Sequence, residues 1–467
     1  MRVPEQVTFR GESGFQTLTI SKMAVYLRCK IIEAWNEKGQ VYYLFFYKDK
    51  FIAGCKARGV KLRSFIAKAF KQGVILTSPH PIIRKIIHDS QTYVIQDFSQ
   101  LVKKLKKQFS PYEQAFILTF FESFIPKKEL FEQIKDIYYR LRRNGQLFCS
   151  WQIVRLLHDF APKNRWARET ANLVTYSKYY SLYFDFSEEL LAKDKIYGEK
   201  LLYDGRNNKD HLILLEHSLL HDGLVMDAAA LAIDSFLNDP DAYDYKTLVE
   251  RLQMVFSEDE VCEIVENMLD HKPDVPLLQN DLLERYLKLG RVHDAAMLIA
   301  EHDIPPSVLS KKALNAILEL ILTDTADLPY EKLQTYLVPL SLYNPEQTEK
   351  AIAKCVNYLL REYDMDYVEN WLAPIKQVNP TLSIYRKMEA IKKFKNNPDK
   401  QLELGKIYYD LHLYELALDC FSWEMELQET NPEPVEWLAK TYKKMGLEEE
   451  ANRYLLLLEN KFFTKSP

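Results

Sequence analysis

Amphipathic segments follow one another from residue 99 to the end of the chain, and short polar turns separate them. In the first of these segments, residues 99–109, Leu101 or Val102, Leu105 and Phe109 share one stripe, and four lysines lie away from it. Apolar positions three and four residues apart mark one face of a helix. A long series of such segments is typical of stacked helical hairpins.

The first 98 residues follow a different pattern, because their apolar residues are mostly β-branched or aromatic and lie in short runs. Such runs favour strands. We expect strands at 24–34, at 41–54 with a turn at 47–50 inside it, at 73–77 and at 92–96, with a hairpin turn at 36–39. We expect a helix over 60–72, with Leu62, Ile66, Ala69 and Phe70 on one face, and a second helix from Pro81. The pattern therefore predicts a small α+β domain that ends near residue 98.

An internal repeat with a period of thirty-four residues lies near the end of the chain. The shift places Gly405 on Ala439, Tyr408 on Tyr442 and Ala417 on Ala451. A small residue on each of two packed helices lets their backbones approach, while a ring one turn away fills the adjacent space. Gly446 lies where the chain must reverse, and glycine accepts the left-handed conformation that ends a helix. The repeat therefore predicts two consecutive helical hairpins.

This period and these residues resemble the tetratricopeptide repeat (TPR) family, whose unit is a helix–turn–helix. The resemblance rests on Leu404, Gly405, Tyr408, Ala417 and Phe421 in one unit, and on Leu438, Ala439, Tyr442, Gly446 and Ala451 in the next. It implies a right-handed superhelix whose concave face is formed by the first helix of each pair. In the family, this concave face usually binds a peptide or the surface of a partner protein.

Weaker copies of the pattern lie upstream, and they matter because a solenoid needs several units to bury a continuous core. One copy contains Leu282, Tyr286, Gly290, Ala295 and Ile299, a second contains Gly223, Ala228 and Pro240, and Gly145 with Pro162 brackets a third. Ser150 stands where this third copy should have alanine, and residues 310–395 fit only through Val368 and Pro380.

The expected fold class is therefore mostly α, with a small N-terminal α+β domain followed by an α-solenoid of TPR-like helical hairpins. We divide the chain into a basic α+β domain at 1–98, divergent helical-hairpin repeats at 99–275, and a TPR-like solenoid with the C-terminal repeats at 276–467. The resemblance implies that the following side chains face the partner-binding groove: Asn280, Glu284, Lys288, Lys406, Tyr409, Glu436, Lys440 and Lys443.

Charge is divided unequally along the chain, whose net charge is −4. Residues 1–110 hold 20 Lys and Arg against 7 Asp and Glu, a net charge of +13, which leaves 42 basic and 59 acidic residues, or −17, in the remainder. Such asymmetry points to an anionic partner for the basic part.

Two groups of cations carry this expectation: Arg58, Lys61, Lys68 and Lys71 in and before the first predicted helix, and Lys103, Lys104, Lys106 and Lys107 in the second group. Spaced cations neutralise phosphates and release counterions, which gives salt-sensitive binding without sequence readout. Tyr42, Tyr43, Phe45, Phe46 and Tyr47 lie nearby, and those on the outward face of their strand could stack on bases. Docking on an acidic protein surface is an equally open interpretation.

Motifs for catalysis are weak in this sequence. His217 and His221 are spaced to share a metal ion, but Ser218 stands where a metalloprotease has its glutamate. Gly54 and Gly59 are not followed by the Lys-Ser/Thr pair of a phosphate-binding loop, and the six cysteines form no C-x-x-C pair. We therefore expect no cofactor, no metal site and no enzymatic activity.

We expect a non-enzymatic adaptor or regulatory protein that binds a protein or peptide partner through the TPR-like groove. The basic domain at 1–98 would be its second contact. The alternative is a peptide-responsive, nucleic-acid-binding regulator that uses its basic N-terminal domain. No stretch reaches the roughly 18 apolar residues of a membrane span, and the start of the chain lacks a signal-like pattern, so we expect a soluble cytoplasmic protein.

Overall fold

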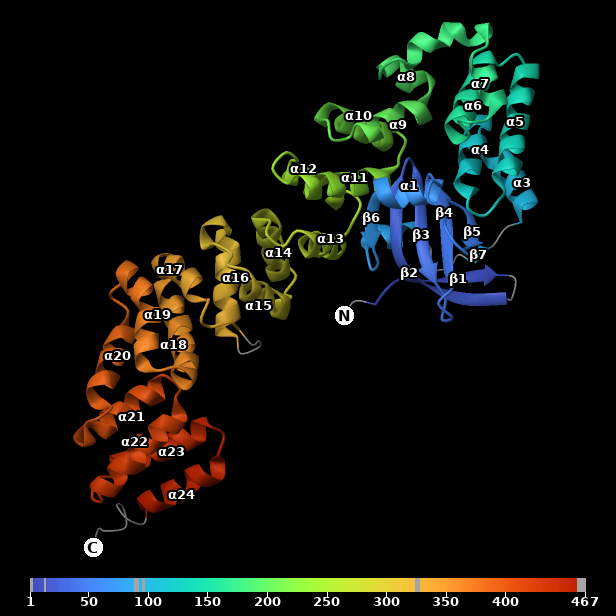
Figure 1. Cartoon of the computed structure of the whole chain (residues 1–467). Helices are drawn as coiled ribbons and strands as arrows, with labels where there is room; N and C mark the ends of the chain where they lie inside the picture. Colours follow the sequence, from blue (N-terminus) through green and yellow to red (C-terminus); the bar gives the residue numbers. More distant parts are fainter. Residues whose placement is uncertain (1–2, 12–13, 88–91, 95–96, 324–327, 460–467) are drawn as a thin grey trace. The chain divides into compact units, whose positions relative to one another are not determined.

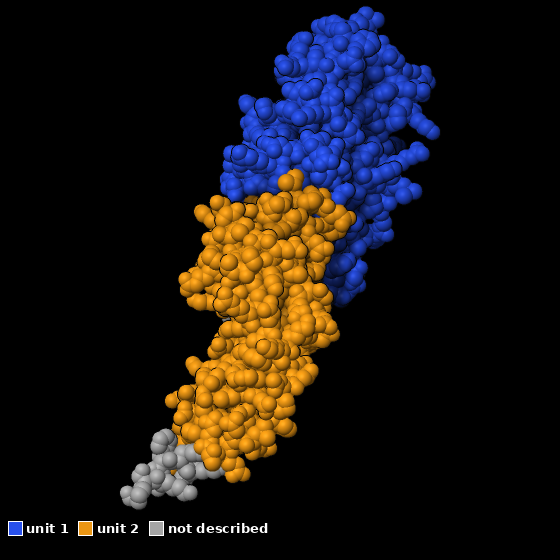
Figure 2. All heavy atoms as spheres, turned by 90° about the vertical axis from the view of Figure 1, so that its left-hand side faces the viewer, with its two compact units in different colours: residues 1–272 blue, residues 273–467 orange. Residues whose placement is uncertain are grey.

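The computed structural model describes residues 3–11, 14–87, 92–94, 97–323 and 328–459. The chain forms two compact units, Met1–Lys272 and Pro273–Pro467, which we call unit 1 and unit 2 (Figure 2). The described strands all lie before residue 95, and helices make up the rest of both units (Figure 1). The predicted fold class is confirmed, whereas the boundary drawn at residue 98 stays a prediction.

Unit 1 begins with a seven-stranded sheet in the order β5-β4-β3-β2-β1-β7, and β6 pairs with β2. The strands are β1 (Gln6–Gly11), β2 (Gly14–Tyr26), β3 (Cys29–Trp35), β4 (Val41–Tyr47), β5 (Lys50–Lys56), β6 (Val74–Thr77) and β7 (Tyr93–Val94). All described pairings are antiparallel except that of β1 with β7. The long β2 pairs with β1 through its first half and with β6 through its second half, on the same edge.

Two parts of the strand prediction were incomplete. The predicted strand at 24–34 is the end of β2 and the whole of β3, because the chain reverses at Leu27 and Arg28, which have φ of 49° and 61°. Neither residue is typical of such a tight turn. The turn inside 41–54 is confirmed, since Lys48 and Asp49 have φ of 47° and 61°. β1 and the first half of β2 were not predicted, and residues 95 and 96 of the predicted last strand lie outside the described residues.

The first predicted helix is shorter than its apolar pattern suggested. α1 spans Phe65–Gln72, and the Ser64 side chain caps it by accepting a hydrogen bond from the Ala67 N–H. Ile66 and Ala69 are buried as expected, but Leu62 precedes the cap and is 95% exposed. The capping hydrogen bond of the serine determines where the helix begins, and one additional apolar residue before it does not extend the helix.

The remaining helices of unit 1 continue from the sheet to residue 271 (Figure 1). They are α2 (Pro81–Ile86), α3 (Phe98–Gln108), α4 (Pro111–Leu118), α5 (Lys127–Arg143), α6 (Leu147–Phe160), α7 (Arg165–Ala171), α8 (Glu188–Lys193), α9 (Lys195–Asp204), α10 (Lys209–His221), α11 (Val225–Asn238), α12 (Tyr245–Gln253) and α13 (Glu258–His271), with 3₁₀ helices at Thr119–Phe121 and Val174–Tyr183. One apolar core joins the sheet face that carries Tyr43, Phe45 and Tyr47 to α1 and to the helices from α3 to α11.

Unit 2 consists of helices joined by short turns. They are α14 (Pro276–Lys288), α15 (Val292–Glu301), α16 (Lys311–Leu322), α17 (Gln334–Tyr343), α18 (Pro345–Glu362), α19 (Met365–Val378), α20 (Ser383–Phe394), α21 (Gln401–Asp410), α22 (Tyr414–Leu427), α23 (Glu433–Lys444) and α24 (Glu448–Leu458), with 3₁₀ helices at Pro306–Val308 and Pro398–Lys400. α21 packs on α22 and α23 packs on α24, and α22 also packs on α23, so the two last hairpins form one stack.

The same reversing turn recurs in several of these hairpins. In α23–α24 the Leu447 N–H donates to the Tyr442 carbonyl at 3.0 Å, and Gly446 between them has φ of 78°. This six-to-one bond around a left-handed residue is the Schellman motif, which satisfies the last carbonyls of a helix. Its left-handed residue is Gly145 in α5–α6, Gly223 in α10–α11, Gly290 in α14–α15 and His412 in α21–α22. The glycine positions in the weaker sequence copies thus mark real helical hairpins.

Gly405 shows why the repeat requires a small residue. A Cβ atom at this position would lie 2.5 Å from Cε1 of Phe421, which is closer than two carbon atoms can approach. The Phe421 ring from α22 therefore rests directly on the backbone of α21. Ala417, Ala439 and Ala451 are all buried at the matching contacts. The Gly405 contact confirms the predicted close approach in α21–α22.

Candidate partner-binding surfaces

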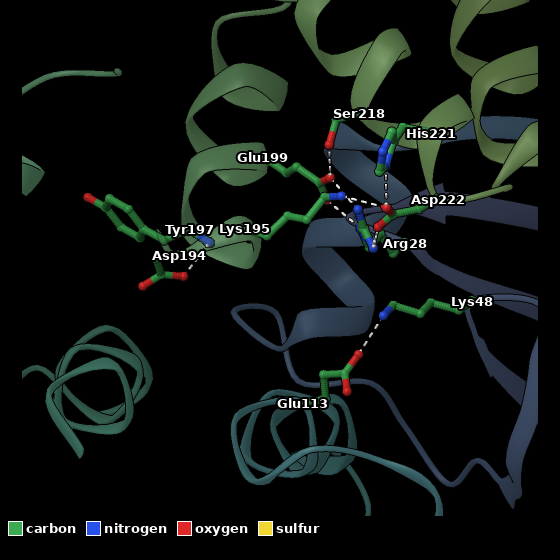
Figure 3. Close-up of polar contacts among 10 residues, drawn as sticks. All are labelled: Arg28, Lys48, Glu113, Asp194, Lys195, Tyr197, Glu199, Ser218, His221 and Asp222. Carbon is green, nitrogen blue, oxygen red and sulfur yellow. Dashed lines mark hydrogen bonds and ion pairs between the residues drawn. The ribbon is translucent and has the colours of Figure 1, made fainter. Parts of the chain in front are cut away.

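Buried ion pairs hold the sheet of unit 1 against its helices (Figure 3). Arg28, in the β2–β3 turn, binds Glu199 of α9 through two nitrogens, and its Nη1 lies 2.7 Å from Oδ2 of Asp222. The Ser218 hydroxyl of α10 donates to Glu199 at 2.5 Å, and Lys195 Nζ lies 2.6 Å from Asp222 Oδ1. The network therefore joins one strand turn to two helices.

Lys30 of β3 forms a second buried junction, because its Nζ pairs with Asp227 of α11 and with Asp49. Burial opposes the charge of Lys30, but the two carboxylates outweigh it and raise its pKa. Burial likewise opposes the charges of Arg28 and Asp222. The bonds to Glu199 and then to Asp222 nevertheless raise the pKa of Arg28, and the bonds from Lys195 and Arg28 lower the pKa of Asp222. Burial also raises the pKa of Asp227, against the opposing effect of Lys30. The ion pairs position the sheet against α9, α10 and α11.

The eight predicted anion-binding cations lie in several places in unit 1. Lys68 and Lys71 are exposed on α1, and Lys103, Lys106 and Lys107 are exposed on α3. Arg58 is exposed in the loop before α1. The other two are held by backbone carbonyls: Lys61 Nζ donates to the Glu122 carbonyl, and Lys104 Nζ donates to the carbonyls of Phe51 at 2.9 Å and Ile52 at 2.8 Å.

The aromatic run in β4 is buried on both faces of the sheet, so the expectation that its outward rings stack on bases was wrong. Tyr43, Phe45 and Tyr47 lie in the core against the helices. Tyr42 instead contacts Phe9 with ring centroids 5.2 Å apart, and Phe46 contacts Tyr93 at 5.8 Å. The sheet offers these rings no free face, because both of its sides are covered.

In unit 2, three of the predicted partner-binding residues gather around Trp437 of α23. Tyr409 of α21 meets the Trp437 ring edge to face, with centroids 5.2 Å apart. Lys440 Nζ lies 4.8 Å from the centre of the same ring, and Lys406 Nζ lies 5.9 Å from it and 2.6 Å from Glu433 Oε1. We call Lys406, Tyr409, Trp437 and Lys440 the Trp437 cluster. It is formed by the first helices of two consecutive hairpins.

The other five predicted groove residues do not contact this cluster in any described interaction. Glu436 and Lys443 lie on α23, half-buried and exposed respectively. On α14, Glu284 accepts a hydrogen bond from the Ser310 N–H at 3.0 Å, Lys288 is exposed, and Asn280 is half-buried with its Oδ1 lacking a partner among the described residues.

A groove of about 900 Å³ lies between α18, α20 and the α21–α22 turn. Its lining includes Lys350, Lys354, Asn357, Tyr358 and Arg361 from α18, Ser383, Ile384 and Lys387 from α20, and Asp410, Leu411, His412 and Tyr414 from the turn. Tyr358 stacks on Tyr330 with centroids 4.3 Å apart, and the Asn357 amide donates to the Leu411 carbonyl at 2.6 Å. None of the eight predicted partner-binding residues lines it.

Ring contacts link this groove to the Trp437 cluster. The Tyr414 ring, which lines the groove, lies 5.6 Å from the ring of Tyr409, and Tyr409 contacts Trp437. Groove and cluster therefore adjoin. Sequence reasoning missed the α18 part because residues 310–395 carry little of the repeat signature. A signal was nevertheless present, since Lys350, Lys354, Tyr358 and Arg361 recur at helical spacing along one face.

No protein-family model matches this chain, and no curated protein matches it in sequence. Among solved structures, it is similar to MamA (12% identity, 47% of this chain and 91% of that chain, TM-score 0.15). It is also similar to a thermophilic TPR protein of Thermus thermophilus (17%, 47% and 90%, TM-score 0.14) and to the TPR domain of P58(IPK) (12%, 71% and 93%, TM-score 0.17).

The architecture rests on the helix pairs, the recurring turn and the Gly405 contact. The helical hairpins are TPR-like. Within the part of the chain that the structure describes, no helix combines the length and apolar character needed to cross a membrane.

Proposed function

We propose that this chain is a non-enzymatic adaptor or regulatory protein that binds a protein or peptide partner through unit 2. The proposed binding surface is the groove of α18 and α20 together with the Trp437 cluster. The observation that carries the proposal is the row of ring contacts from Tyr414 through Tyr409 to Trp437, flanked by lysines. Tryptophan and tyrosine are enriched among the residues that dominate binding energies.

The charges along this surface favour an acidic segment of the partner. Four cations line the groove, namely Lys350, Lys354, Arg361 and Lys387, against Glu349 and Asp410. Both carboxylates are already engaged, because Glu349 accepts from the Ser383 N–H at 2.8 Å and Asp410 lies 3.3 Å from Lys387. Lys387 pairs with Asp410, and Lys350 lies 3.5 Å from Glu346. The lining still holds two more cations than carboxylates, which favours an incoming carboxylate.

The rings supply the second requirement of the proposed partner. Trp437 also stacks on Phe421 with centroids 5.7 Å apart, which fixes the plane of its ring. A rigid ring costs little conformational entropy when it binds an apolar side chain. The proposed partner segment thus combines acidic residues with an apolar or aromatic anchor. The free state of all six cysteines supports the cytoplasmic location that we propose for this interaction.

A peptide-display selection against the full-length chain tests the proposal. We expect enriched peptides to be acidic with an apolar anchor, and their affinity to fall about tenfold or more when Lys406→Glu and Lys440→Glu are combined. The matched control is Lys312→Glu with Lys393→Glu, which makes the same charge change at two exposed lysines outside the groove lining and the cluster. Equal binding by the two double variants would refute the proposed surface.

A further inference from the structure

Unit 1 contains a second cleft, of about 830 Å³, that the proposed partner-binding surface does not use. Its walls come from α1, α4, α6 and α9, the segment 161–164 that follows α6, and the loop before α1. Charged residues in its lining are Arg63, Lys68, Lys71, Glu122, Lys127, Arg155, Asp159, Lys163 and Lys200. Only Lys68 and Lys71 were among the cations singled out in the sequence. We call it the α1–α6 cleft.

The two carboxylates of this cleft are already satisfied by other groups. Glu122 accepts from the Phe65 N–H at 2.9 Å and from Lys127 Nζ at 3.3 Å. Asp159 lies 3.0 Å from Lys200 Nζ. The remaining cations are Arg63, Lys68, Lys71, Arg155 and Lys163, and none of them forms an ion pair with another described residue. Five cations without an ion pair among the described residues therefore line one cavity, although Lys68 also acts electrostatically on Asp204, outside the lining.

Arg155 is the most constrained of these five. Its guanidinium lies over two tyrosine rings, 4.2 Å from the centre of Tyr183 and 4.3 Å from that of Tyr197. The Nε atom is buried and has no hydrogen-bond partner among the described residues. A buried donor without an acceptor costs free energy, and a planar guanidinium held by rings matches the oxygens of a phosphate group. Both features point to an anionic ligand next to Arg155.

Apolar side chains form the other part of the wall. Phe116 of α4, Leu156 of α6 and Ile196 of α9 line the cleft, and the exposed Leu62 lies on its lining as well. A ligand that fills this space would contact both charge and hydrocarbon. The volume lies in the range of about 300 to 1,000 Å³ that small-molecule sites occupy.

We propose that the α1–α6 cleft binds a small phosphorylated molecule of nucleotide size, with phosphates against Arg155 and the lysines and an apolar or aromatic group against Phe116, Leu156 and Ile196. The arrangement favours a small ligand over nucleic acid, because these cations surround one cavity and the exposed α3 lysines are not part of its lining. An extended polyanion is usually bound by a continuous basic stripe. This proposal is independent of partner binding by unit 2.

Titration of the full-length chain with a fluorescent ATP analogue tests the site. We expect saturable binding that weakens about tenfold or more in Arg155→Lys, which keeps the charge but loses the planar fork, and in Lys68→Glu combined with Lys71→Glu. Lys103→Glu with Lys107→Glu is the matched control on α3, and we expect its affinity to stay within about twofold. Because Lys68 and Lys71 are exposed, their replacement keeps the test valid even if an Arg155 variant fails to fold.

Competition distinguishes the ligand classes in the same assay. Unlabelled ATP should displace the probe at a lower concentration than tripolyphosphate, since only ATP has a group for the apolar wall. The proposal is overturned if no phosphorylated probe binds at millimolar concentration, or if the α3 control weakens binding as much as the α1 variant. It is also overturned if tripolyphosphate, a short RNA or an acidic peptide competes better than ATP.

Discussion

Unit 1 and unit 2 differ in how far apart in sequence their decisive contacts lie. In unit 1, Arg28 binds Glu199 and Lys30 binds Asp227, so the pairs are separated by 171 and 197 residues. In unit 2, the close approach of Gly405 to the Phe421 ring occurs within one hairpin. Contacts within one hairpin, as in unit 2, produce a periodic pattern in the sequence. Buried ion pairs between distant segments, as in unit 1, produce no such pattern.

The two kinds of contact also differ energetically. A buried ion pair gains little net stability, since desolvation of both charges offsets their attraction, but removal of one partner leaves a charge stranded in the core. Removal of atoms from a packed apolar contact loses their transfer free energy and adds the cost of the cavity that remains, so the effect depends on shape. Unit 1 should therefore be the more sensitive to loss of a single charged group, and unit 2 to a change of shape.

The largest effect is expected from Asp227→Ala. Lys30 is fully buried and would keep only the partly exposed Asp49, so we expect the sheet–helix junction to lose about 3 kcal/mol. Hydrogen exchange of β3 and α11 measures the loss. Glu169→Ala, which removes an exposed pair with Arg165, is the control and should leave exchange unchanged. If Lys30→Met with Asp227→Leu restores protection, the charge and not the shape is responsible.

A smaller effect is expected from Gly405→Ala in unit 2. The added methyl group overlaps the Phe421 ring, and we expect a loss of about 2 kcal/mol, seen as faster hydrogen exchange in α21 and α22. Phe421→Leu in the same chain should recover part of the loss because it makes room. Were Gly405→Ala neutral, the small-residue explanation of the repeat would be wrong.

A pH effect of similar or smaller size is expected in unit 1. His80 is buried, its Nδ1 accepts from the Ile82 N–H at 3.1 Å, and burial together with Arg84 and His271 lowers its pKa from 6.5 to about 3. Below pH 6.5 the unfolded chain binds a proton here that the folded chain does not. The stability contribution is therefore complete above pH 6.5 and decreases as the pH falls toward 3, by about 2 kcal/mol at pH 5.

His80→Asn isolates this contribution, because asparagine can accept the same hydrogen bond but does not titrate. The free energy of unfolding of unit 1 can be measured by urea titration. For His80→Asn we expect this free energy to depend less on pH between 6.5 and 5 than it does for the original chain. Identical pH dependence in the two proteins would show that His80 does not cause the acid sensitivity.

The smallest effect is expected at the turn of α21–α22. His412 has φ of 62° at the position where α23–α24 has Gly446, so His412→Gly removes backbone strain. Glycine also gains freedom in the unfolded chain, and the 2.7 Å contact of His412 with the Tyr414 hydroxyl is lost. We expect His412→Gly to stabilise α21 by about 0.5 kcal/mol, measured as slower hydrogen exchange in this helix. Gly446→Ala should instead speed hydrogen exchange in α23.

The sequence predicted much of the architecture because its informative features are local. Glycine at the hairpin turns, small residues at close contacts and aromatic runs in the strands each act within one element or one hairpin. The reversal at Leu27 and Arg28 was missed because its residues are atypical of tight turns, and its arginine instead pairs with residues far along the chain. In β1, Gln6, Arg10 and Gly11 leave only the three strand-favouring residues from Val7 to Phe9, which is too short a run for a clear signal.

The candidate sites were predicted less completely. Lys406, Tyr409 and Lys440 do meet, but Trp437, which they surround, was not singled out. The α18 groove and the α1–α6 cleft are formed by segments whose proximity no periodicity indicates. Arg155 can be recognised as a candidate ligand-binding residue only from the structure. Two tyrosine rings lie under its guanidinium, and its buried Nε has no acceptor among the described residues.

Site-specific photo-crosslinking tests most directly which face of unit 2 binds the partner. A photoreactive amino acid would replace Tyr358 in the groove, Lys440 in the Trp437 cluster, or Trp423 of α22, which is 53% exposed and lines neither. With a peptide selected by display as the target, we predict crosslinks from positions 358 and 440 and none from position 423. Crosslinks from position 423 alone would contradict the proposed binding surface.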